Sequence, residues 1–294
     1  MNTSKKIGIV TVLYNSDDVL PGFFESLSQQ LDIDYKLYVI DNSPSNSGTI
    51  LSENLAQKYN IPCFCLFNNA NVGVAKGNNQ GIELALKDQC DYILLANNDT
   101  EFNSTAIASL RDAITQSGDS LSTSKIMYFD QPEKIWYAGG KIDPWLMRTP
   151  HFGILDVDRG QFDQQDTVDY APTCFMMVDK KVFEDVGLMD EKYFVYYDDS
   201  DFVFRARQKG YNIRFVPQSL VLHKVSSSTG GGSSPFSIYY TNRNKIYFIR
   251  KNLKGFNKIF TMSFALLSTV YKVAVLNKLK SNGLVKAVAD GFKV

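Results

Sequence analysis

Residues 92–99 read Tyr92-Ile93-Leu94-Leu95-Ala96-Asn97-Asn98-Asp99, five apolar residues followed by two amides and a carboxylate. An uninterrupted apolar run of this length is typical of a strand that is buried on both faces, as in a parallel sheet covered by helices. The polar residues would then emerge at the carboxyl end of the strand, where ligands bind in open α/β sheets. The stretch therefore predicts a doubly wound fold and the edge of the sheet where a site would lie.

The first hundred residues alternate between strand-like and helix-like segments, as a doubly wound α/β sheet requires. Besides 92–96, we expect strands at 7–13, 35–40 and 63–67, with helices at 19–31, 50–59 and 74–86. A polar loop follows each strand, and these loops should gather at one edge of the sheet. They contain Tyr14-Asn15-Ser16, Asp41-Asn42-Ser43, residues 68–73 and Asn97-Asn98-Asp99.

Beyond Thr100 the pattern is less regular. We expect a helix to about Ser117, then an irregular stretch rich in aromatic residues, and then a second block with strands at 174–178 and 212–216 and an acidic helix start at 197–201. The composition, 44% hydrophobic and 21% charged, argues against disordered, collagen-like and coiled-coil architectures. We therefore expect one α/β domain, residues 1–242, and a helical appendage, residues 243–294.

The net charge of zero hides an asymmetry between these two parts. Residues 243–294 hold eleven Lys or Arg and one acid, Asp290, a net charge of +10, so residues 1–242 sum to −10. An acidic body would repel phosphate, which argues against a nucleic-acid-binding domain. A basic, apolar tail instead suits a protein tethered to an anionic membrane surface.

The tail is expected to lie on the membrane and not to cross it. Its longest uncharged apolar run, residues 259–271, is shorter than the roughly 20 residues that a span requires. Lysines flank this run on both sides, which is typical of an interfacial helix. The alternative is that the tail helices pack back on the acidic body or form a dimer interface.

Two features of the sequence bear on the cellular compartment of the protein, namely its N-terminus and its cysteines. Residues 1–6 run directly into a strand-like segment without the apolar stretch of a signal peptide, so we expect a cytoplasmic protein at the inner face of the cell membrane. The four cysteines lack paired metal-ligand spacing and are expected to be reduced thiols.

Two strand ends offer ligand chemistry. Asp99, flanked by Asn97 and Asn98, could hold a hard divalent ion that bridges two phosphates, because Mg²⁺ and Mn²⁺ take oxygen ligands. The alternative is a turn that caps the following helix. Asp41 could accept the imide N–H of a uracil or thymine ring, and its alternative is an Asx-turn.

The run from Asn68 to Asn79 enters a helix with glycines and few bulky side chains. It includes Asn71, Gly73 and Lys76, and it would permit close approach of the backbone to a nucleotide or sugar. Lys76 is not placed as in a Gly-Lys-Ser/Thr phosphate loop.

Asp198, Asp199 and Asp201 stand at a helix start under aromatic residues. Two adjacent carboxylates in such surroundings can include a general base, although acids in a first helical turn also simply complement the helix dipole. His223 follows an apolar segment and could supply an imidazole to the ion held by Asp99, or be a structural histidine. His151, the other histidine, is assigned no role.

In order and spacing these signals resemble the family 2 glycosyltransferases of GT-A fold, within them the bacterial branch that builds polysaccharides with rhamnosyl or galactofuranosyl units. The matching residues are Val10 to Asn15, Val39 to Ser43, Asn71 to Gly73, Gly77 to Gly81, Leu94 to Asp99, Val186 to Glu191, Tyr196 to Asp201 with Arg205 and Gly210, and His223.

The resemblance implies a Rossmann-like nucleotide-sugar-binding domain of GT-A fold. Thr11, Tyr14 and Asp41 would hold the base and ribose, with Asn15, Asn71, Gly73, Lys76, Asn97 and Asn98 around the donor. Asp99 and His223 would bind Mn²⁺ or Mg²⁺. Asn97 stands where the family often has an aspartate, so one carboxylate ligand is missing. Asp199 would be the base, and Asp198 replaces the glutamate beside it.

The implied activity is inverting transfer of a sugar from a nucleoside diphosphate to a glycan or lipid-linked acceptor in cell-surface polysaccharide synthesis, with rhamnose from dTDP-rhamnose as the best candidate. The alternatives are a galactofuranosyl or other UDP-sugar transferase, and a catalytically weak, membrane-peripheral glycan-binding protein on the same fold. A homo-oligomer is possible. A glycoside hydrolase needs no pyrimidine-binding aspartate. A nucleotidyltransferase would open with a Gly-rich phosphate loop instead of Tyr14-Asn15-Ser16-Asp17.

Overall fold

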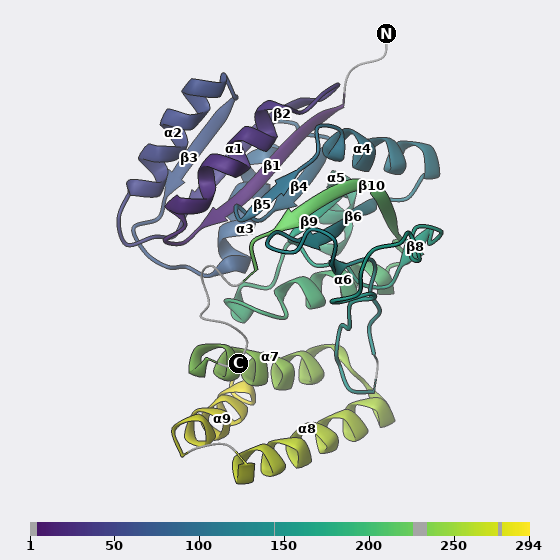
Figure 1. Ribbon diagram of the computed structural model, residues 1–294. Helices are drawn as coiled ribbons and strands as arrows, with labels where there is room; N and C mark the ends of the chain where they lie inside the picture. The colour runs from purple at the N-terminus through teal and green to yellow at the C-terminus, as the bar shows by residue number, and fades with distance from the viewer. Residues whose placement is uncertain (1–4, 144, 226–233, 276–277) are drawn as a thin grey trace.

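The strands lie in one mixed sheet in the order β3-β2-β1-β4-β9-β6-β10-β5, with β7 paired to β6 and β8 paired to β10 (Figure 1). The computed structural model describes residues 5–143, 145–225, 234–275 and 278–294. The strands are β1 (Lys6–Leu13), β2 (Asp34–Asp41), β3 (Cys63–Phe67), β4 (Tyr92–Ala96), β5 (Thr100–Phe102), β6 (Leu121–Tyr128), β7 (Ile135–Tyr137), β8 (Thr167–Val168), β9 (Phe175–Asp179) and β10 (Ile213–His223).

Helices connect and cover the sheet. In chain order they are the 3-10 turn Asp17–Val19, α1 (Leu20–Ser28), α2 (Ser47–Tyr59), α3 (Val74–Lys87), α4 (Ala106–Ser117), α5 (Lys180–Val186), the 3-10 turn Glu191–Tyr193, α6 (Asp198–Gln208), α7 (Pro235–Asn252), α8 (Gly255–Val275) and α9 (Lys278–Gly291). The expected strand and helix positions in the first hundred residues are confirmed to within a few residues.

The first half of the sheet is the doubly wound part. β1 pairs in parallel with β2 on one side and with β4 on the other, so the chain reverses its strand order at β1. All five residues of β4 are buried, as the apolar run Tyr92 to Ala96 indicates. The loops that follow β1, β2 and β4 therefore meet at one edge, as expected.

The second half brings two later segments to that same edge. β9 is antiparallel to both β4 and β6, and β10 is parallel to β6, so the carboxyl end of β10 lies on the same side as that of β4. β5 pairs antiparallel with β10, and Thr100 is opposite His223. This pairing places Asp99 beside the end of β10, although more than one hundred residues separate them in sequence.

The three C-terminal helices form a layer beside the α/β part, with α8 farthest from the sheet (Figure 1). α7 packs on the body, and α9 packs on α7, where Arg250 donates to the carbonyl of Gly291 at 2.9 Å and Tyr239 to Asp290 at 2.8 Å. The expected boundary at residues 242 and 243 falls inside α7. The basic tail thus packs partly back on the body, which was the alternative arrangement for it.

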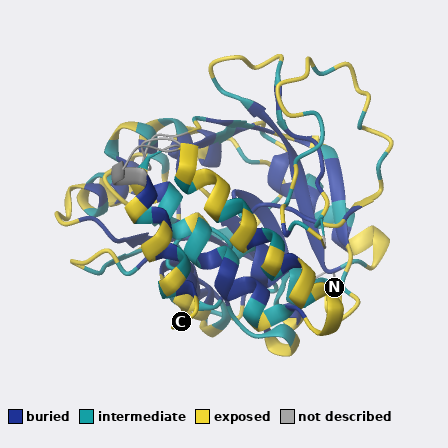
Figure 2. Cartoon of the chain, turned by 90° about the horizontal axis from the view of Figure 1, so that it is seen from below, coloured by how far each residue is buried: buried dark blue, intermediate teal, exposed yellow. Residues whose placement is uncertain are grey.

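α8 is longer than expected. It has 21 residues, and an 18-residue window of it has a mean hydropathy of 1.3, which is long and apolar enough to cross a membrane by length and composition. The prediction that no helix reaches this length was wrong, because the helix continues past Lys258 and Lys272 at the two ends of the apolar run. Most of it is exposed, as the yellow outward surfaces of the helices in Figure 2 illustrate.

The four cysteines are free thiols, as expected. Cys90 and Cys174 are buried, and Cys63 and Cys65 are partly buried in β3. They contribute to the core and not to a disulfide framework.

Candidate active site

Asp99 and His223 meet at the ends of neighbouring strands. Nε2 of His223 lies 3.3 Å from Oδ1 of Asp99, and both side chains are about nine-tenths buried. Nδ1 of His223 has no hydrogen-bond partner in the described part of the chain. Burial alone would lower the pKa of His223, but the neighbouring Cys174 and Asp99 outweigh it and raise the pKa to about 10. The structure thus brings together the two residues predicted to bind a metal.

Once His223 has lost its proton, its imidazole nitrogen and the carboxylate oxygen of Asp99 suit Mn²⁺ or Mg²⁺ shared with phosphate oxygens, since metal binding displaces ligand protons and catalytic metal sites keep positions open for substrate. Among the described residues there is no group of three His, Cys, Asp or Glu that could hold an ion without such help. Asn97, at the same strand end, is exposed. The residues fit a metal that needs the diphosphate to complete its ligands.

Asp199 is held in one orientation. The hydroxyl of Tyr170 donates to its Oδ2 at 2.6 Å, and the backbone N–H of Ser200 donates to its Oδ1 at 2.6 Å. The side chain is partly exposed, so a substrate can reach it. An accessible, oriented carboxylate at a helix start has the geometry of a general base.

Asp198, its neighbour, is different. It is buried, and burial followed by the nearby charge of Asp199 raises its pKa to about 8. A carboxyl group that stays protonated near neutral pH cannot compete for the same proton. The pair is therefore split into a buried acid and an accessible carboxylate, which favours Asp199 as the base.

A row of rings connects this base to the His223 pair. Trp136 stands edge-on to His223 with ring centroids 4.6 Å apart, and edge-on to His151 at 4.7 Å. His151 stacks on Tyr170 at 5.9 Å, and Tyr170 bonds Asp199. Trp136 and Tyr170 were not predicted from the sequence, and His151 was assigned no role. The only signal was the aromatic richness of the irregular stretch.

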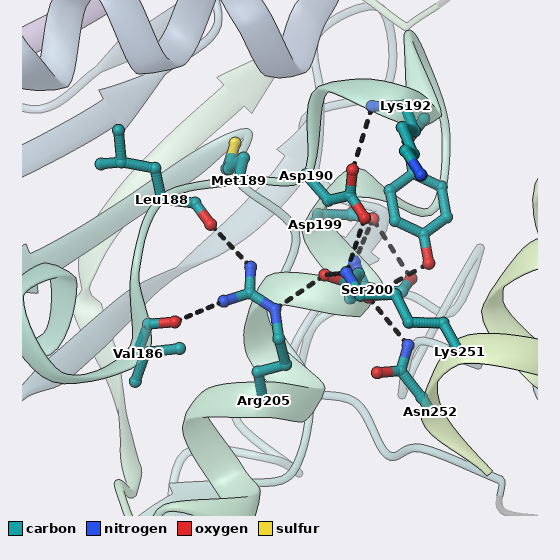
Figure 3. Close-up of polar contacts among 12 residues, drawn as sticks. Val186, Leu188, Met189, Asp190, Lys192, Asp199, Ser200, Arg205, Lys251 and Asn252 are labelled. Carbon is teal, nitrogen blue, oxygen red and sulfur yellow. Dashed lines mark hydrogen bonds and ion pairs between the residues drawn. The ribbon is translucent and has the colours of Figure 1, made fainter. Parts of the chain in front are cut away.

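A buried network fixes the helix that carries the two acids (Figure 3). Asp201, fully buried, accepts from Arg205 Nε at 2.8 Å and from Lys251 Nζ at 2.9 Å, while Arg205 also donates to the carbonyls of Val186 and Leu188. Lys251 belongs to α7. Arg205 therefore holds α6 against the loop before it, and Lys251 holds it against the C-terminal helices.

The turn before α6 is strained. Phe194, Tyr196 and Tyr197 have φ of 65°, 62° and 67°, the left-handed region that side chains rarely adopt. Asn244 of α7 is fully buried and donates from its amide nitrogen to three carbonyls of this turn, those of Tyr193, Val195 and Tyr196, at 2.7 to 2.8 Å. α7 thus supports the position of the acids directly.

The loops that were predicted to bind the nucleotide-sugar donor lie close to one another. Asn42 donates to the carbonyl of Gly73 at 3.1 Å, and Asn68 donates to Asn42 at 2.8 Å. Asn15 donates from its backbone to Ser43 at 2.9 Å. Tyr14, Asn71 and Lys76 are exposed around this edge.

Three other residues predicted to bind the sugar donor are buried, and two of them make hydrogen bonds within the protein. Asp41 is fully buried and accepts from the N–H of Ser43 and from Thr49, so the Asx-turn alternative is present. Asn98 donates to the carbonyl of Val12 at 2.7 Å, which joins β4 to β1. Thr11 is also buried, and its hydroxyl has no hydrogen-bond partner within the described ranges.

The glycines in and after the Asn68 to Asn79 run lie close to other parts of the protein. A Cβ on Gly73 would lie 2.6 Å from the ring of Phe194, and one on Gly77 would lie 2.8 Å from Val12. Gly81, one turn on, is similarly close to Val10. These glycines let α3 and its entry loop approach the protein's own strand and catalytic turn.

Comparison with known sequences identifies the family. The sequence model of glycosyl transferase family 2 matches residues 8–187. The chain is 25% identical over 241 residues, 81% of its length, to the low-salt glycan biosynthesis hexosyltransferase Agl10 of Haloferax volcanii, of which 74% is covered. It is 24% identical over 256 residues, 85% of its length, to the dTDP-rhamnosyl transferase RfbF of Shigella flexneri, of which 81% is covered.

Solved structures share the fold. GalNAc-T7 with UDP, GalNAc and Mn²⁺ superposes with a TM-score of 0.63 at 15% identity over 95% of this chain and 59% of that one. S. aureus TarS gives 0.61 at 15% identity, and although 98% of this chain is covered, it spans only 49% of TarS. The mannosyltransferase PcManGT of Pyrobaculum calidifontis, with GDP-Man and Mn²⁺, gives 0.60 at 10% identity over 98% of this chain and 87% of that one. The GT-A architecture is confirmed, and the chain belongs to glycosyl transferase family 2.

Proposed function

We propose that this glycosyltransferase moves a sugar from a nucleoside diphosphate to a glycan or lipid-linked acceptor with inversion, and that Asp199 is the general base. The observation that carries the proposal is the oriented, accessible Asp199 carboxylate, joined through Tyr170, His151 and Trp136 to the Asp99–His223 pair. Asp199 would take the proton of the acceptor hydroxyl as that oxygen attacks the anomeric carbon.

Asp99 and His223 are the residues that would hold Mn²⁺ or Mg²⁺. Bound there, the ion would neutralise charge on the departing diphosphate. Two of the similar solved structures contain Mn²⁺ with a nucleotide or nucleotide sugar, which supports the same donor chemistry here.

For the donor we propose dTDP-rhamnose, because RfbF is a dTDP-rhamnosyl transferase and the match covers most of both chains. Galactofuranosyl or another UDP-sugar is the second candidate. A thermal-shift panel of dTDP, UDP and GDP and their sugars, with and without Mn²⁺, tests this choice, because a selective ligand stabilises the fold by mass action. We expect the largest shift with dTDP-rhamnose and Mn²⁺, and no shift with any nucleotide would contradict the enzymatic proposal.

We further propose that the protein works at the inner face of the cell membrane, with α8 on the membrane surface. Large apolar side chains exposed along α8 support this proposal: Phe256, Ile259, Phe260, Leu266, Leu267, Val270, Tyr271 and Val275. Their three- and four-residue spacing puts many of them on one side of the helix. Trp145 of the body, itself half exposed, contacts Phe260 with ring centroids 5.5 Å apart and extends the same apolar surface.

A further inference from the structure

Two thiols lie side by side in β3, the strand at one edge of the sheet (Figure 1). Cys63 and Cys65 are two residues apart, and their Sγ atoms are separated by 3.7 Å. In the order of the sheet, β2 and β1 stand between β3 and β4, the strand that leads to Asp99. The thiol pair is therefore separate from the catalytic centre.

The thiol pair lies on the face of β3 that α2 covers, within reach of solvent. Alternate residues of a strand point to opposite faces, and Phe64, between the two cysteines, lines a cavity against α3. Cys63 and Cys65 thus share the other face, where the carboxylate of Glu53 in α2 acts electrostatically on both thiols. Both cysteines are only partly buried, so an ion from solution can reach them.

The two sulfur atoms share a proton. The hydrogen bond to Cys65, and then burial, raise the pKa of Cys63, whereas the same hydrogen bond lowers the pKa of Cys65 against the effect of burial. Thiolates are the form in which cysteines bind metals, and metal binding displaces protons from them. A cation could therefore take the place of the shared proton.

The separation of the sulfur atoms fits an ion better than a disulfide. Two thiolates on a tetrahedral Zn²⁺, with Zn–S bonds of about 2.3 Å, have sulfur atoms about 3.8 Å apart. The Cα atoms of residues i and i+2 in an extended strand are about 6.7 Å apart, at the upper end of the range that a disulfide tolerates. An ion can thus bridge the thiol pair without bending β3, whereas a disulfide would strain the strand.

We propose that Cys63 and Cys65 bind one thiophilic ion with a filled d shell, Zn²⁺ by its bond lengths, with solvent completing the coordination. Soft thiolate ligands select such ions, whereas Mg²⁺ takes oxygen ligands. Glu53, whose carboxylate has no ion-pair partner in the part of the chain that the structure describes, would add to the attraction for the cation. Because solvent holds the remaining positions, the ion would exchange with solution.

The test uses Cd²⁺, which has the same filled shell, because its bonds to thiolates absorb in the ultraviolet and its bonds to oxygen do not. The full-length, reduced protein is titrated with Cd²⁺ in excess Mg²⁺, and Zn²⁺ is then added as a competitor. Cys63→Ser and Cys65→Ser each remove one proposed ligand. Cys174→Ser is the matched control, since the thiol of Cys174 interacts with His223 and would report an ion bound at the catalytic pair.

We expect the wild-type protein and Cys174→Ser to bind one Cd²⁺ per chain with thiolate absorption, and Zn²⁺ to displace it. Cys63→Ser and Cys65→Ser should each lose at least the roughly 10- to 100-fold in affinity that removal of an outer partner of a metal ligand costs. Absorption that persists in both of these variants and disappears in Cys174→Ser would place the ion at the catalytic pair and overturn the proposal. A wild type without thiolate absorption would also overturn it.

A second measurement needs no variant, so it does not depend on how well the serine variants fold. The wild-type protein is treated with iodoacetamide with and without Zn²⁺, and the modification of each cysteine is followed by mass spectrometry. We expect Zn²⁺ to protect Cys63 and Cys65 together and Mg²⁺ to protect neither. Alkylation rates that Zn²⁺ leaves unchanged, or equal protection by Mg²⁺, would contradict a thiolate site.

Discussion

The hydroxyl of Tyr170 lies 2.6 Å from Oδ2 of Asp199 and joins the proposed base to the ring row that ends at His223. The two residues are 29 positions apart and come from different elements, the segment after β8 and the first turn of α6. The orientation of the base is therefore set by tertiary structure and not by α6 alone.

Removing that hydroxyl should slow turnover without weakening donor binding. Tyr170→Phe keeps the stacked ring but loses one hydrogen bond to a charged group, which typically contributes about 1.5 to 3 kcal/mol, so we expect kcat to fall roughly 10- to 100-fold. Steady-state kinetics, with the donor KM measured separately, checks this expectation. Tyr59→Phe, which loses a hydroxyl bonded only to the exposed Lys58, is the control. A rise in donor KM at constant kcat would place Tyr170 in donor binding instead.

The buried Asp198 should make stability depend on pH. Its folded-state pKa is raised to about 8, above the value in the unfolded chain, so the unfolded state binds fewer protons than the native state between about pH 4 and 8. This group's contribution to stability is thus fully present below about pH 4 and is lost as the pH rises toward 8. Asp198→Asn should raise the Tm at pH 8 and above, relative to wild type.

Thermal melts of Asp198→Asn from pH 5 to about 9 measure this dependence, with the exposed Asp18→Asn as the matched control. The difference in Tm between Asp198→Asn and wild type should widen with rising pH. A difference that is constant across the series would mean that Asp198 is not protonated in the native state.

Asn244 should be needed for the shape of the catalytic turn. Asn244→Ala removes an amide donor that three carbonyls of the turn share, although the carbonyl of Tyr193 keeps the N–H of Val195. An unsatisfied buried group costs about 1 to 3 kcal/mol, so we expect a loss of roughly 2 kcal/mol or more in unfolding free energy. Denaturant unfolding gives the value. Asn242→Ala, which loses one hydrogen bond to Ile238 in the same helix, should cost less than half as much. Equal costs would argue against a special role for Asn244.

The exposed face of α8 should carry membrane binding. Ile259 and Leu267 are 67% and 70% exposed, so replacing both with Glu should leave the Tm nearly unchanged and abolish sedimentation with anionic liposomes. Val285→Glu on α9, 53% exposed, is the control and should still sediment. High salt should weaken the remaining electrostatic attraction. Undiminished binding by the double variant would exclude α8 as the anchor.

The sequence predicted the part of the site that depends on where single strands end. Parallel strands ending in polar residues place Asp41 and Asp99 at one edge whatever the rest of the fold does. The position of His223 after an apolar segment left metal binding and a structural role both open, and the family resemblance chose metal binding. The structural reason for its contact with Asp99 is the pairing of β10 with β5, which no local pattern encodes. The ring row was not predictable, because Trp136 lies in the three-residue strand β7, too short for a periodic pattern, and His151 and Tyr170 lie in connections.

Glycine permits close approach by a ligand and by the protein itself, so Gly77 alone could not reveal its close contact with Val12 of β1. The error about the length of α8 has a plain physical cause. The uncharged apolar run ends at Lys258 and Lys272, so its length underestimated the helix. A helix can continue through such lysines because their long side chains extend the ammonium groups toward water.

The role of Asp199 is the central claim, and one experiment tests it most directly. Sugar transfer is measured for Asp199→Asn and Asp198→Asn at saturating donor, with donor affinity determined on the same samples by thermal shift. We expect Asp199→Asn to retain donor binding and to lose roughly 10²- to 10⁴-fold in turnover, as removal of a general base does, and Asp198→Asn to be milder. Turnover that falls further in Asp198→Asn than in Asp199→Asn would contradict the assignment of the base.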